Sequence, residues 1–276
     1  MNLILQGPSL TALQAQEAAL LARTPAIETL GEHAFRLRDA TFDAAIPAWC
    51  ESRRIDHAFM PPGRRFAALK LLAMDMDSTL ITIECIDELG DMAGKKGEIA
   101  AITERAMRGE IDFSESLRRR VALLAGLPLA ALERVYEERL RLSPGADALL
   151  AACKRNGVKV LLVSGGFTFF VERLKERLGI DYAISNVLEV AHGRLSGRLR
   201  GRIVDAEAKA ARFRAAVREL GAARGETVAI GDGANDLKMM AEAGTSVAYR
   251  AKPVVRARAS CALSWAGLDG VLNLFE

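Results

Sequence analysis

Two aspartates separated by one residue, Asp75 and Asp77, are the first candidates for chemistry in this sequence. They follow the apolar segment 71–74, which has the composition of a buried strand. Strand alternation would point both side chains to the same side, at the carboxyl end where open α/β sheets bind ligands. Two carboxylates this close repel each other unless a cation lies between them or one is protonated. We therefore expect a hard divalent cation with oxygen ligands here, although this pair alone would also suit an ordinary polar turn.

Two later segments also carry residues suited to binding phosphate or metal. Ser164-Gly165-Gly166 follows an apolar strand predicted over 158–163 and precedes a predicted helix, so its backbone amides can approach an anion. On its own it could equally be an ordinary strand-to-helix turn. The run Gly-Asp-Gly-Ala-Asn-Asp at 231–236 follows a buried strand predicted over 227–230 and adds two acids at a strand end. It is not a dinucleotide-binding glycine motif, because Asp236 stands where the third glycine would be.

Residues 75–84, Asp-Met-Asp-Ser-Thr-Leu-Ile-Thr-Ile-Glu, resemble the nucleophile motif of the haloacid dehalogenase superfamily, the aspartate-dependent phosphatases, and in particular of its phosphoserine phosphatases. The run at 231–236 is similar to a second motif of that superfamily, and all four of its motifs are present in order. The resemblance extends from about residue 71 to 265. It implies Mg2+-dependent hydrolysis of O-phospho-L-serine to L-serine and phosphate through an aspartyl-phosphate, the last step of L-serine biosynthesis.

The resemblance also assigns roles to individual residues. The first aspartate would be the nucleophile and the second the general acid and base. A lysine, Lys209, is singled out only because residues 205–209 resemble the family's lysine region, since a lysine on a helix usually faces solvent. The implied residues are, for catalysis, Asp75 and Asp77; for phosphate, Ser164, Gly165 and Lys209; for substrate, Glu84, Phe113, Arg120 and Asn235; and for the metal, the Asp75 side chain, the Asp77 backbone carbonyl and Asp232, with Asp236 as a direct or indirect ligand.

Glu84 and Arg120 would select the substrate. Glu84 begins a segment that matches the family's Glu-x-Ile-Asp-Glu, whose first glutamate receives the substrate ammonium. Arg120 ends a segment similar to the family's Ser-Leu-Arg-x-Arg, whose last arginine binds the substrate carboxylate. On a helix Arg120 lies about 60° from Leu117 and so borders the apolar stripe, which also suits an arginine that only covers apolar surface. Phe113 matches the aromatic that closes over the substrate, and without that match it would be assigned to the core.

The order of predicted elements indicates an α/β protein with a doubly wound, Rossmann-like parallel sheet. We expect residues 65–276 to form this catalytic domain. An almost entirely helical cap is predicted over 84–142, and a small antiparallel β flap over about 186–204. In and just before the flap, the predicted strands are 182–185, 187–190 and about 194–199, with a turn at His192-Gly193.

Residues 1–64 are predicted to form a small α+β module with the order β-α-β-α-β, ending at the linker Pro61-Pro62-Gly63. Residues 26–38 have strand-like alternation, and Thr41 is a candidate N-cap for a second helix that would run through Arg54. The module resembles a shortened form of the regulatory, amino-acid-binding (ACT-like) domain that precedes the catalytic domain in many bacterial members of the family. A packing or dimerisation module without a ligand is an equally open interpretation.

Composition narrows the function classes. The chain has 276 residues with 38 basic and 35 acidic side chains, so its net charge of +3 favours neither nucleic acid nor membrane as a partner. Its four cysteines include no Cys-x-x-Cys pair, which fits a reducing cytoplasm. The start lacks the features of a signal peptide, and no apolar run suits a membrane span. We expect a cytoplasmic enzyme with a small-molecule substrate, and a homodimer is one option for its assembly.

Three alternatives remain open. A phosphatase of the same fold could act on another small phosphomonoester. A phosphotransferase could pass the phosphoryl group from the aspartate to another hydroxyl, such as that of homoserine. A regulatory amino-acid-binding protein could carry an inactive catalytic domain, although the intact Asp75, Asp77, Lys209 and Asp232 argue against this. Oxygen ligands favour Mg2+, but Mn2+ would fit and Ca2+ could bind and inhibit.

Overall fold

A parallel sheet forms the centre of the larger domain in this computed structural model, which describes residues 1–276. Its strands are β5 (Leu71–Met74), β6 (Lys159–Phe167), β7 (Tyr182–Ala191), β8 (Arg194–Arg200), β9 (Thr227–Gly231), β10 (Thr245–Tyr249) and β11 (Cys261–Leu263). Their order across the sheet is β11-β10-β9-β5-β6-β7-β8. All neighbours are parallel except β7 and β8, which form an antiparallel hairpin. The predicted α/β fold is therefore confirmed.

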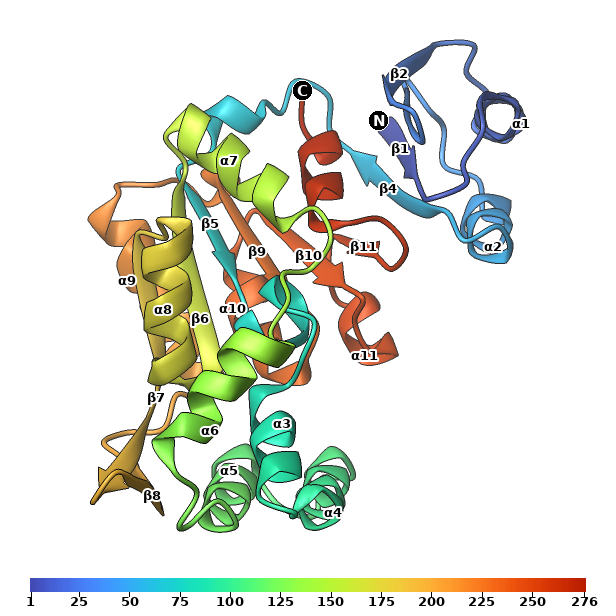
Figure 1. Ribbon diagram of the computed structural model, residues 1–276. Coiled ribbons are helices and arrows are strands. Elements are labelled where there is room, and N and C mark those ends of the chain that lie inside the picture. Colours follow the sequence, from blue (N-terminus) through green and yellow to red (C-terminus); the bar gives the residue numbers. More distant parts are fainter.

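Helices cover both faces of this sheet (Figure 1). The principal ones are α7 (Ala146–Asn156), α8 (Thr168–Leu178), α9 (Ala206–Glu219), α10 (Leu237–Glu242) and the short α11 (Pro253–Arg256). Alternate residues of β5 point to opposite faces. Leu72 and Met74 pack in the core that includes α7 and α8, whereas Leu71 and Ala73 pack in the core that includes α9 and α10. The sheet is thus doubly wound, as predicted. None of the helices is long and apolar enough to cross a membrane.

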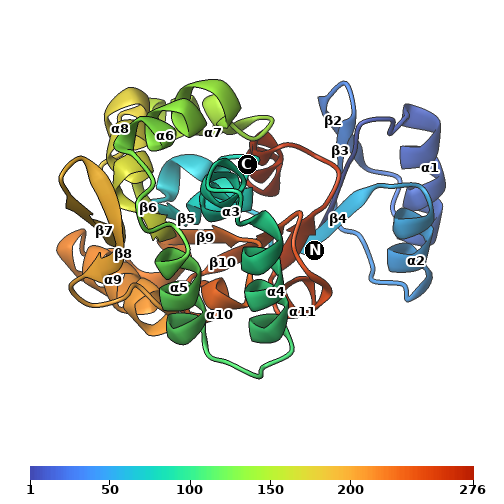
Figure 2. The same ribbon diagram turned by 60° about the horizontal axis from the view of Figure 1, so that its bottom comes forward.

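Between β5 and α7 the chain forms a helical cap, as predicted. It contains α3 (Cys85–Met92), α4 (Lys96–Met107), α5 (Phe113–Ala122), α6 (Leu129–Arg134) and the single wide turn η3 (Val135–Arg139). Its two ends lie side by side, because the N–H of Thr82 donates to the carbonyl of Arg141 at 3.0 Å and that of Ser143 to Leu80 at 2.9 Å. Figure 2 shows α3, α4 and α5 in front of the ends of the central strands, so the cap covers the carboxyl edge of the sheet.

The flap is the hairpin of β7 and β8. The prediction of separate strands at 182–185 and 187–190 is wrong, because β7 runs without a break through Asn186. His192 and Gly193 form the turn, with φ of 49° and 73°. The hairpin contacts the cap closely at Gly197, where φ is 80° and an added Cβ would lie 2.9 Å from the Ala125 Cβ.

The amino-terminal module has the order β-α-β-β-α-β, one strand more than predicted. Its elements are β1 (Asn2–Gln6), α1 (Ala12–Leu21), β2 (Ile27–Gly31), β3 (Ala34–Leu37), α2 (Ala45–Ser52) and β4 (Asp56–Met60), and the sheet order is β2-β3-β1-β4. Residues 26–38 fold back on themselves as a hairpin instead of forming one strand. Thr41 does not cap α2. The carboxylate of Asp43 instead accepts a hydrogen bond from the N–H of Ala45 at 2.9 Å.

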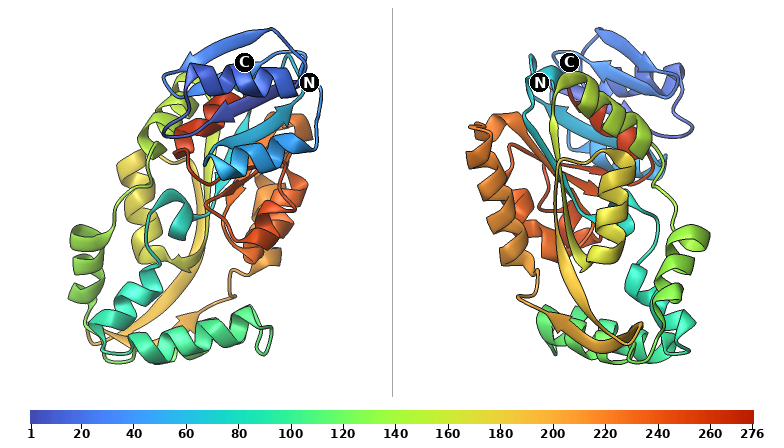
Figure 3. Two further views of the ribbon diagram at one scale, coloured as in Figure 1. Left: turned by 90° about the vertical axis from the view of Figure 1, so that its right-hand side faces the viewer. Right: turned by 60° about the vertical axis from the view of Figure 1, so that its left-hand side comes forward.

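The module packs on the larger domain through the face of its sheet that α1 and α2 leave uncovered (Figure 3). Ile4, Ala58 and Met60 belong to the main core of the larger domain. Asp56 also accepts hydrogen bonds from the backbone N–H groups of residues 264–266, at 2.7–3.0 Å. The chain ends beside this sheet in the 3-10 segment η6 (Leu268–Leu274).

Candidate active site

Asp75 and Asp77 lie at the carboxyl end of β5, but the chain that carries them no longer follows the strand. It enters η2 (Met76–Leu80), a single wide helical turn, and Ser78 has a left-handed φ of 55°. Strand alternation is therefore the wrong explanation for their placement, and a wide turn of this kind is typical of functional sites. Both carboxylates are buried, with 5% and 9% of the residue exposed.

Each of the two carboxylates is held by a backbone N–H group. The Asp75 Oδ1 accepts from the N–H of Met76 at 2.7 Å, which leaves its Oδ2 free to face other groups. The Asp77 Oδ1 accepts from the N–H of Cys85, the first residue of the cap, at 2.9 Å. The hydroxyl of Ser164 lies 3.5 Å from the Asp77 Oδ2. Asp77 is thus placed between the cap and the end of β6.

Ser164, Gly165 and Gly166 form the irregular end of β6 and are not a separate turn as predicted. The Ser164 hydroxyl is buried and accepts a hydrogen bond from the N–H of Gly166 at 2.8 Å. A Cβ at Gly166 would lie 2.5 Å from the Asp77 Oδ2, which is too close for any side chain. The glycine therefore allows this backbone to approach the carboxylate directly.

Lys209 is completely buried, unlike most lysines on helices. It is in the first turn of α9, where its Nζ lies 2.9 Å from the Asp75 Oδ2 and 2.8 Å from the Asp236 Oδ1. Burial alone would lower the pKa of Lys209, but the charges of Asp236 and Asp75 outweigh it and raise the pKa above the usual range. The lysine is therefore cationic, and its ammonium group faces the carboxylate predicted to be the nucleophile.

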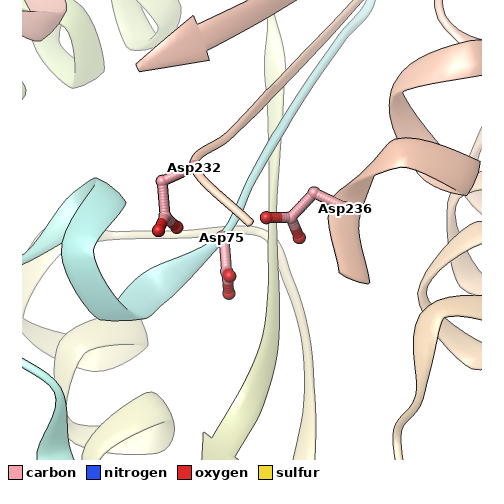
Figure 4. Close-up of side chains that lie close together, drawn as sticks. All are labelled: Asp75, Asp232 and Asp236. Carbon is pink, nitrogen blue, oxygen red and sulfur yellow. The ribbon is translucent and has the colours of Figure 1, made fainter. Parts of the chain in front are cut away.

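Three carboxylates from different segments meet at this edge of the sheet. Asp75 follows β5, Asp232 follows β9, and Asp236 ends the turn η5 (Ala234–Asp236) before α10 (Figure 4). One oxygen of each lies within 4.8 Å of the others. The side chain of Asp77 is outside this group.

The charges in this cluster do not balance without a further cation. Burial raises the pKa of Asp75 well above its usual range, and the charge of Asp236 adds to this effect while Lys209 opposes it. Burial and Asp236 likewise raise the pKa of Asp232 to about 6. Three carboxylates with one lysine leave excess negative charge in a buried place, and all the donors are oxygens. These features fit a hard divalent cation, which would relieve the repulsion.

Glu84 and Arg120 lie on the cap side of the same region. Glu84 precedes α3, and its Oε1 accepts from the Ser78 hydroxyl at 2.7 Å. Surrounding protein and the charge of Asp77 raise the pKa of Glu84 to about 8, although one side of the residue is open to water, which screens part of this effect. Burial lowers the pKa of Arg120, while Asp87 and Glu84 oppose this. Arg120 is half-buried and makes no ion pair.

Phe113 connects the cap to the segment Ser164-Gly165-Gly166, the phosphate-loop candidate. Its ring lies against Gly165, since a Cβ added there would be 3.0 Å from the Phe113 Cζ. Asn235 lies in η5, between Asp232 and Asp236 along the chain, and its side chain makes no hydrogen bond within the protein. The structure thus brings the predicted residues together around one edge of the sheet and the cap above it.

Sequence reasoning missed three contributors to this site. Ser78 and Thr79 lie within the first motif, where Ser78 binds Glu84 and the Thr79 hydroxyl lies 3.2 Å from Asp232. Their hydroxyl groups next to two acids were a usable signal. Asn186 hydrogen-bonds to the carbonyl of Gly165 from 21 positions along the chain, and no local pattern indicates this contact.

The model of the haloacid dehalogenase-like hydrolase family matches residues 72–241, so the chain belongs to that family. A second model, described as a domain of unknown function, matches residues 3–46. Within the family, the chain is 56% identical to phosphoserine phosphatase of Polaromonas sp. over 220 residues, which cover 78% of this chain and 93% of the relative.

Solved structures agree with this assignment. A probable phosphoserine phosphatase from Vibrio cholerae aligns with a TM-score of 0.86 and 39% identity, over 99% of this chain and 85% of that one. A phospho-aspartyl intermediate analogue of phosphoserine phosphatase aligns with a TM-score of 0.71 and 38% identity, over 75% of this chain and 99% of that one.

Proposed function

We propose that this protein hydrolyses O-phospho-L-serine to L-serine and phosphate. The observation that carries the proposal is the pairing of two sites under one cap. Asp75, Lys209 and Ser164 offer a nucleophile and phosphate ligands, whereas Glu84 and the unpaired Arg120 offer one anion and one cation for a zwitterion. The relatives named phosphoserine phosphatase support this substrate.

In the proposed first step, the Oδ2 of Asp75, which faces Lys209, attacks phosphorus and forms an aspartyl-phosphate, and the bond from phosphorus to the serine oxygen breaks. Asp77 donates its proton to that oxygen, so L-serine leaves as the alcohol. In the second step Asp77 takes a proton from water, which attacks phosphorus and releases phosphate and the Asp75 carboxylate. Burial raises the pKa of Asp77, which favours the protonated form that the first step needs. The solved phospho-aspartyl analogue of a relative supports this sequence of steps.

The phosphate group would be bound by three groups that already lie beside the nucleophile. Lys209 faces Asp75 at 2.9 Å and would neutralise charge on the equatorial oxygens. The Ser164 hydroxyl and the backbone of Gly165 would donate hydrogen bonds from the other side. Positioning and charge stabilisation of this kind account for most of the catalysis of phosphoryl transfer.

The cap would bind the carboxylate and ammonium groups of phosphoserine. Arg120 would bind the carboxylate, and Glu84, once ionised, would bind the ammonium. Phe113 would close over the substrate beside Gly165, and Asn235 would contact it from the opposite loop. Because Phe113 and Arg120 are both on α5, movement of the cap would deliver both contacts together and exclude water.

The acid cluster is proposed to bind Mg2+ through the Asp75 side chain, the Asp77 backbone carbonyl and Asp232, with Asp236 as a direct or neighbouring ligand. Bound there, Mg2+ would neutralise charge on the phosphate and on the carboxylates. The wider context is also part of the proposal. The enzyme would act in the cytoplasm at the last step of L-serine biosynthesis, as a monomer or homodimer, and the module of residues 1–64 would serve packing or regulation.

Phosphate release from a panel of phosphomonoesters in Mg2+ tests this function, with Asp75→Asn as the control. Rapid release from phosphoserine, much slower release from sugar phosphates and no release by the variant are expected. Equal activity across the panel would refute the roles of Glu84 and Arg120 but keep the nucleophile. New phosphoesters formed with added homoserine would indicate a phosphotransferase, and serine binding without any turnover a regulatory protein.

A further inference from the structure

Asn186, in the middle of β7, connects two separate parts of the site. Its Nδ2 donates to the carbonyl of Gly165 at 2.8 Å, and its Oδ1 accepts from the N–H of Val204 at 2.8 Å. The residue is only 2% exposed, so both polar ends of a buried amide are used. Asparagine is unfavourable in strands, and these two bonds give a reason for its presence.

The first bond fixes the phosphate-loop candidate. Between the pairs Val163–Ile184 and Phe167–Asn186, residues 164–166 of β6 face only Ser185 of β7. The extra residues of such a bulge lose regular ladder partners. The peptide between Gly165 and Gly166 is therefore held by side chains, with its carbonyl bonded to Asn186 and its N–H to the Ser164 hydroxyl at 2.8 Å.

The second bond fixes the start of the helix that carries Lys209. Val204 is buried and directly precedes Asp205, the N-cap of α9, whose carboxylate accepts from the N–H of Ala208 at 2.8 Å. The N–H of Lys209 donates to the carbonyl of the same Asp205 at 2.9 Å. A shift at Val204 would therefore be passed along one helical turn to the ammonium group that faces Asp75.

We propose that Asn186 is a positioning residue that holds the Ser164-Gly165-Gly166 loop and the Lys209 helix at a fixed separation, so that one phosphate group meets both. This inference rests on the proposed phosphatase function and adds a determinant of phosphate binding to it. The Asn186 side chain makes no hydrogen bond to the nucleophile or to the cap, and we expect it to act through the backbone of Gly165 and Val204.

Two substitutions distinguish the contribution of the Gly165 bond from that of the Val204 bond. Asn186→Asp keeps the shape and can accept from Val204, but when ionised it cannot donate to Gly165. Asn186→Leu removes both bonds at similar volume. One buried partner left unpaired corresponds to a factor of about 10 in binding, and two to about 100. We therefore expect inorganic phosphate, measured by calorimetry in Mg2+, to bind about tenfold more weakly to Asn186→Asp and about 100-fold more weakly to Asn186→Leu.

Kinetics give a readout that general damage to the protein would not produce. The values of kcat/KM for phosphoserine and p-nitrophenyl phosphate should fall by the same factor, because both substrates share only the phosphate. The selectivity between them should stay within about twofold of the wild type. Ser185→Ala is the matched control, because Ser185 is next to Asn186 on β7 and its hydroxyl hydrogen-bonds only to the Thr168 hydroxyl at the start of α8, at 3.1 Å. It should leave phosphate affinity unchanged.

The outcomes are distinguishable. If the folded Asn186 variants bind phosphate within twofold of the wild type, or if the wild type binds none, the inference is wrong. If the wild type binds phosphate but hydrolyses no ester, the proposed function fails while calorimetry still tests the positioning role. If Asn186→Leu does not fold by circular dichroism, the isosteric Asn186→Asp decides the question alone.

Discussion

Replacing Lys209 with methionine tests how much of the protein's stability depends on the buried charges of the site. Methionine has nearly the length of lysine but leaves Asp75, Asp232 and Asp236 without their buried cation. In the structure, the Lys209 Nζ lies within 2.9 Å of oxygens from two of these acids, and the lysine is fully buried. Removing one partner of a buried ion pair costs about 3–5 kcal/mol. We expect urea unfolding in EDTA at pH 8 to show a loss of this size.

The loss should grow with pH. The pKa values of Asp75 and Asp232 are already above the usual value of 3.8, and without Lys209 they would rise further. Where pH lies between the unfolded and folded pKa of an acid, the folded state binds more protons, so the free energy of unfolding falls as pH rises. The difference between wild type and Lys209→Met should therefore be smaller at pH 5 than at pH 8.

A divalent cation should partly replace the missing charge. Mg2+ at 100 times its dissociation constant adds about 2.7 kcal/mol to the free energy of unfolding, so Lys209→Met in Mg2+ should approach the stability of the wild type in EDTA without recovering activity. Lys238→Met is the matched control, because Lys238 is exposed and its only partner is Glu207 at 3.3 Å. It should change stability by less than about 0.5 kcal/mol. A difference between wild type and Lys209→Met that does not change with pH, or a variant that Mg2+ fails to stabilise, would refute the reasoning.

Three further substitutions test other parts of the structure. Because the pKa of Glu84 is about 8, the group becomes charged as pH rises, and KM for phosphoserine should fall between pH 7 and 9 in the wild type but not in Glu84→Gln, as measured by steady-state kinetics. Asp56→Ala leaves the three backbone N–H groups of residues 264–266 without their acceptor, so urea unfolding should show a loss of about 3 kcal/mol. Gly197→Val would clash with Ala125 between flap and cap, and we expect more rapid proteolysis of the cap and at least a tenfold lower kcat/KM.

The edge of the sheet that carries the site could be predicted from short segments alone. Apolar runs predicted β5, β6 and β9, and the polar motifs directly after them had to meet because carboxyl ends of parallel strands share one edge. The direction in which a helix side chain points could not be predicted in the same way. Lys209 came only from family resemblance, and for Arg120 helix geometry gave no more than a place beside the apolar stripe, because the burial of both depends on contacts with distant segments.

The amino-terminal module shows a second limit. Residues 26–38 alternate like one strand, and the turn near Glu32 that divides them contains no residue pair typical of a tight hairpin. Pairing with β1 decides the outcome, since β3 lies between β1 and β2 in the sheet. Such pairing is a tertiary contact, and alternation within a segment is the same for one strand and for two.

The interruption of β7 wrongly predicted at Asn186 also arose because a local pattern does not show tertiary contacts. The predicted strands stop at 185 and resume at 187, and asparagine is depleted in strands because its short amide competes for backbone hydrogen bonds. In the structure the Asn186 amide donates to the carbonyl of Gly165 and accepts from the N–H of Val204, two backbone groups that lie outside the regular strand pairing. The first belongs to the segment that contacts Asp77, and the second to the segment that carries Lys209 to Asp75. A buried polar residue in a strand, such as Asn186, can therefore indicate backbone groups of distant segments that need a partner, and here those segments form the site.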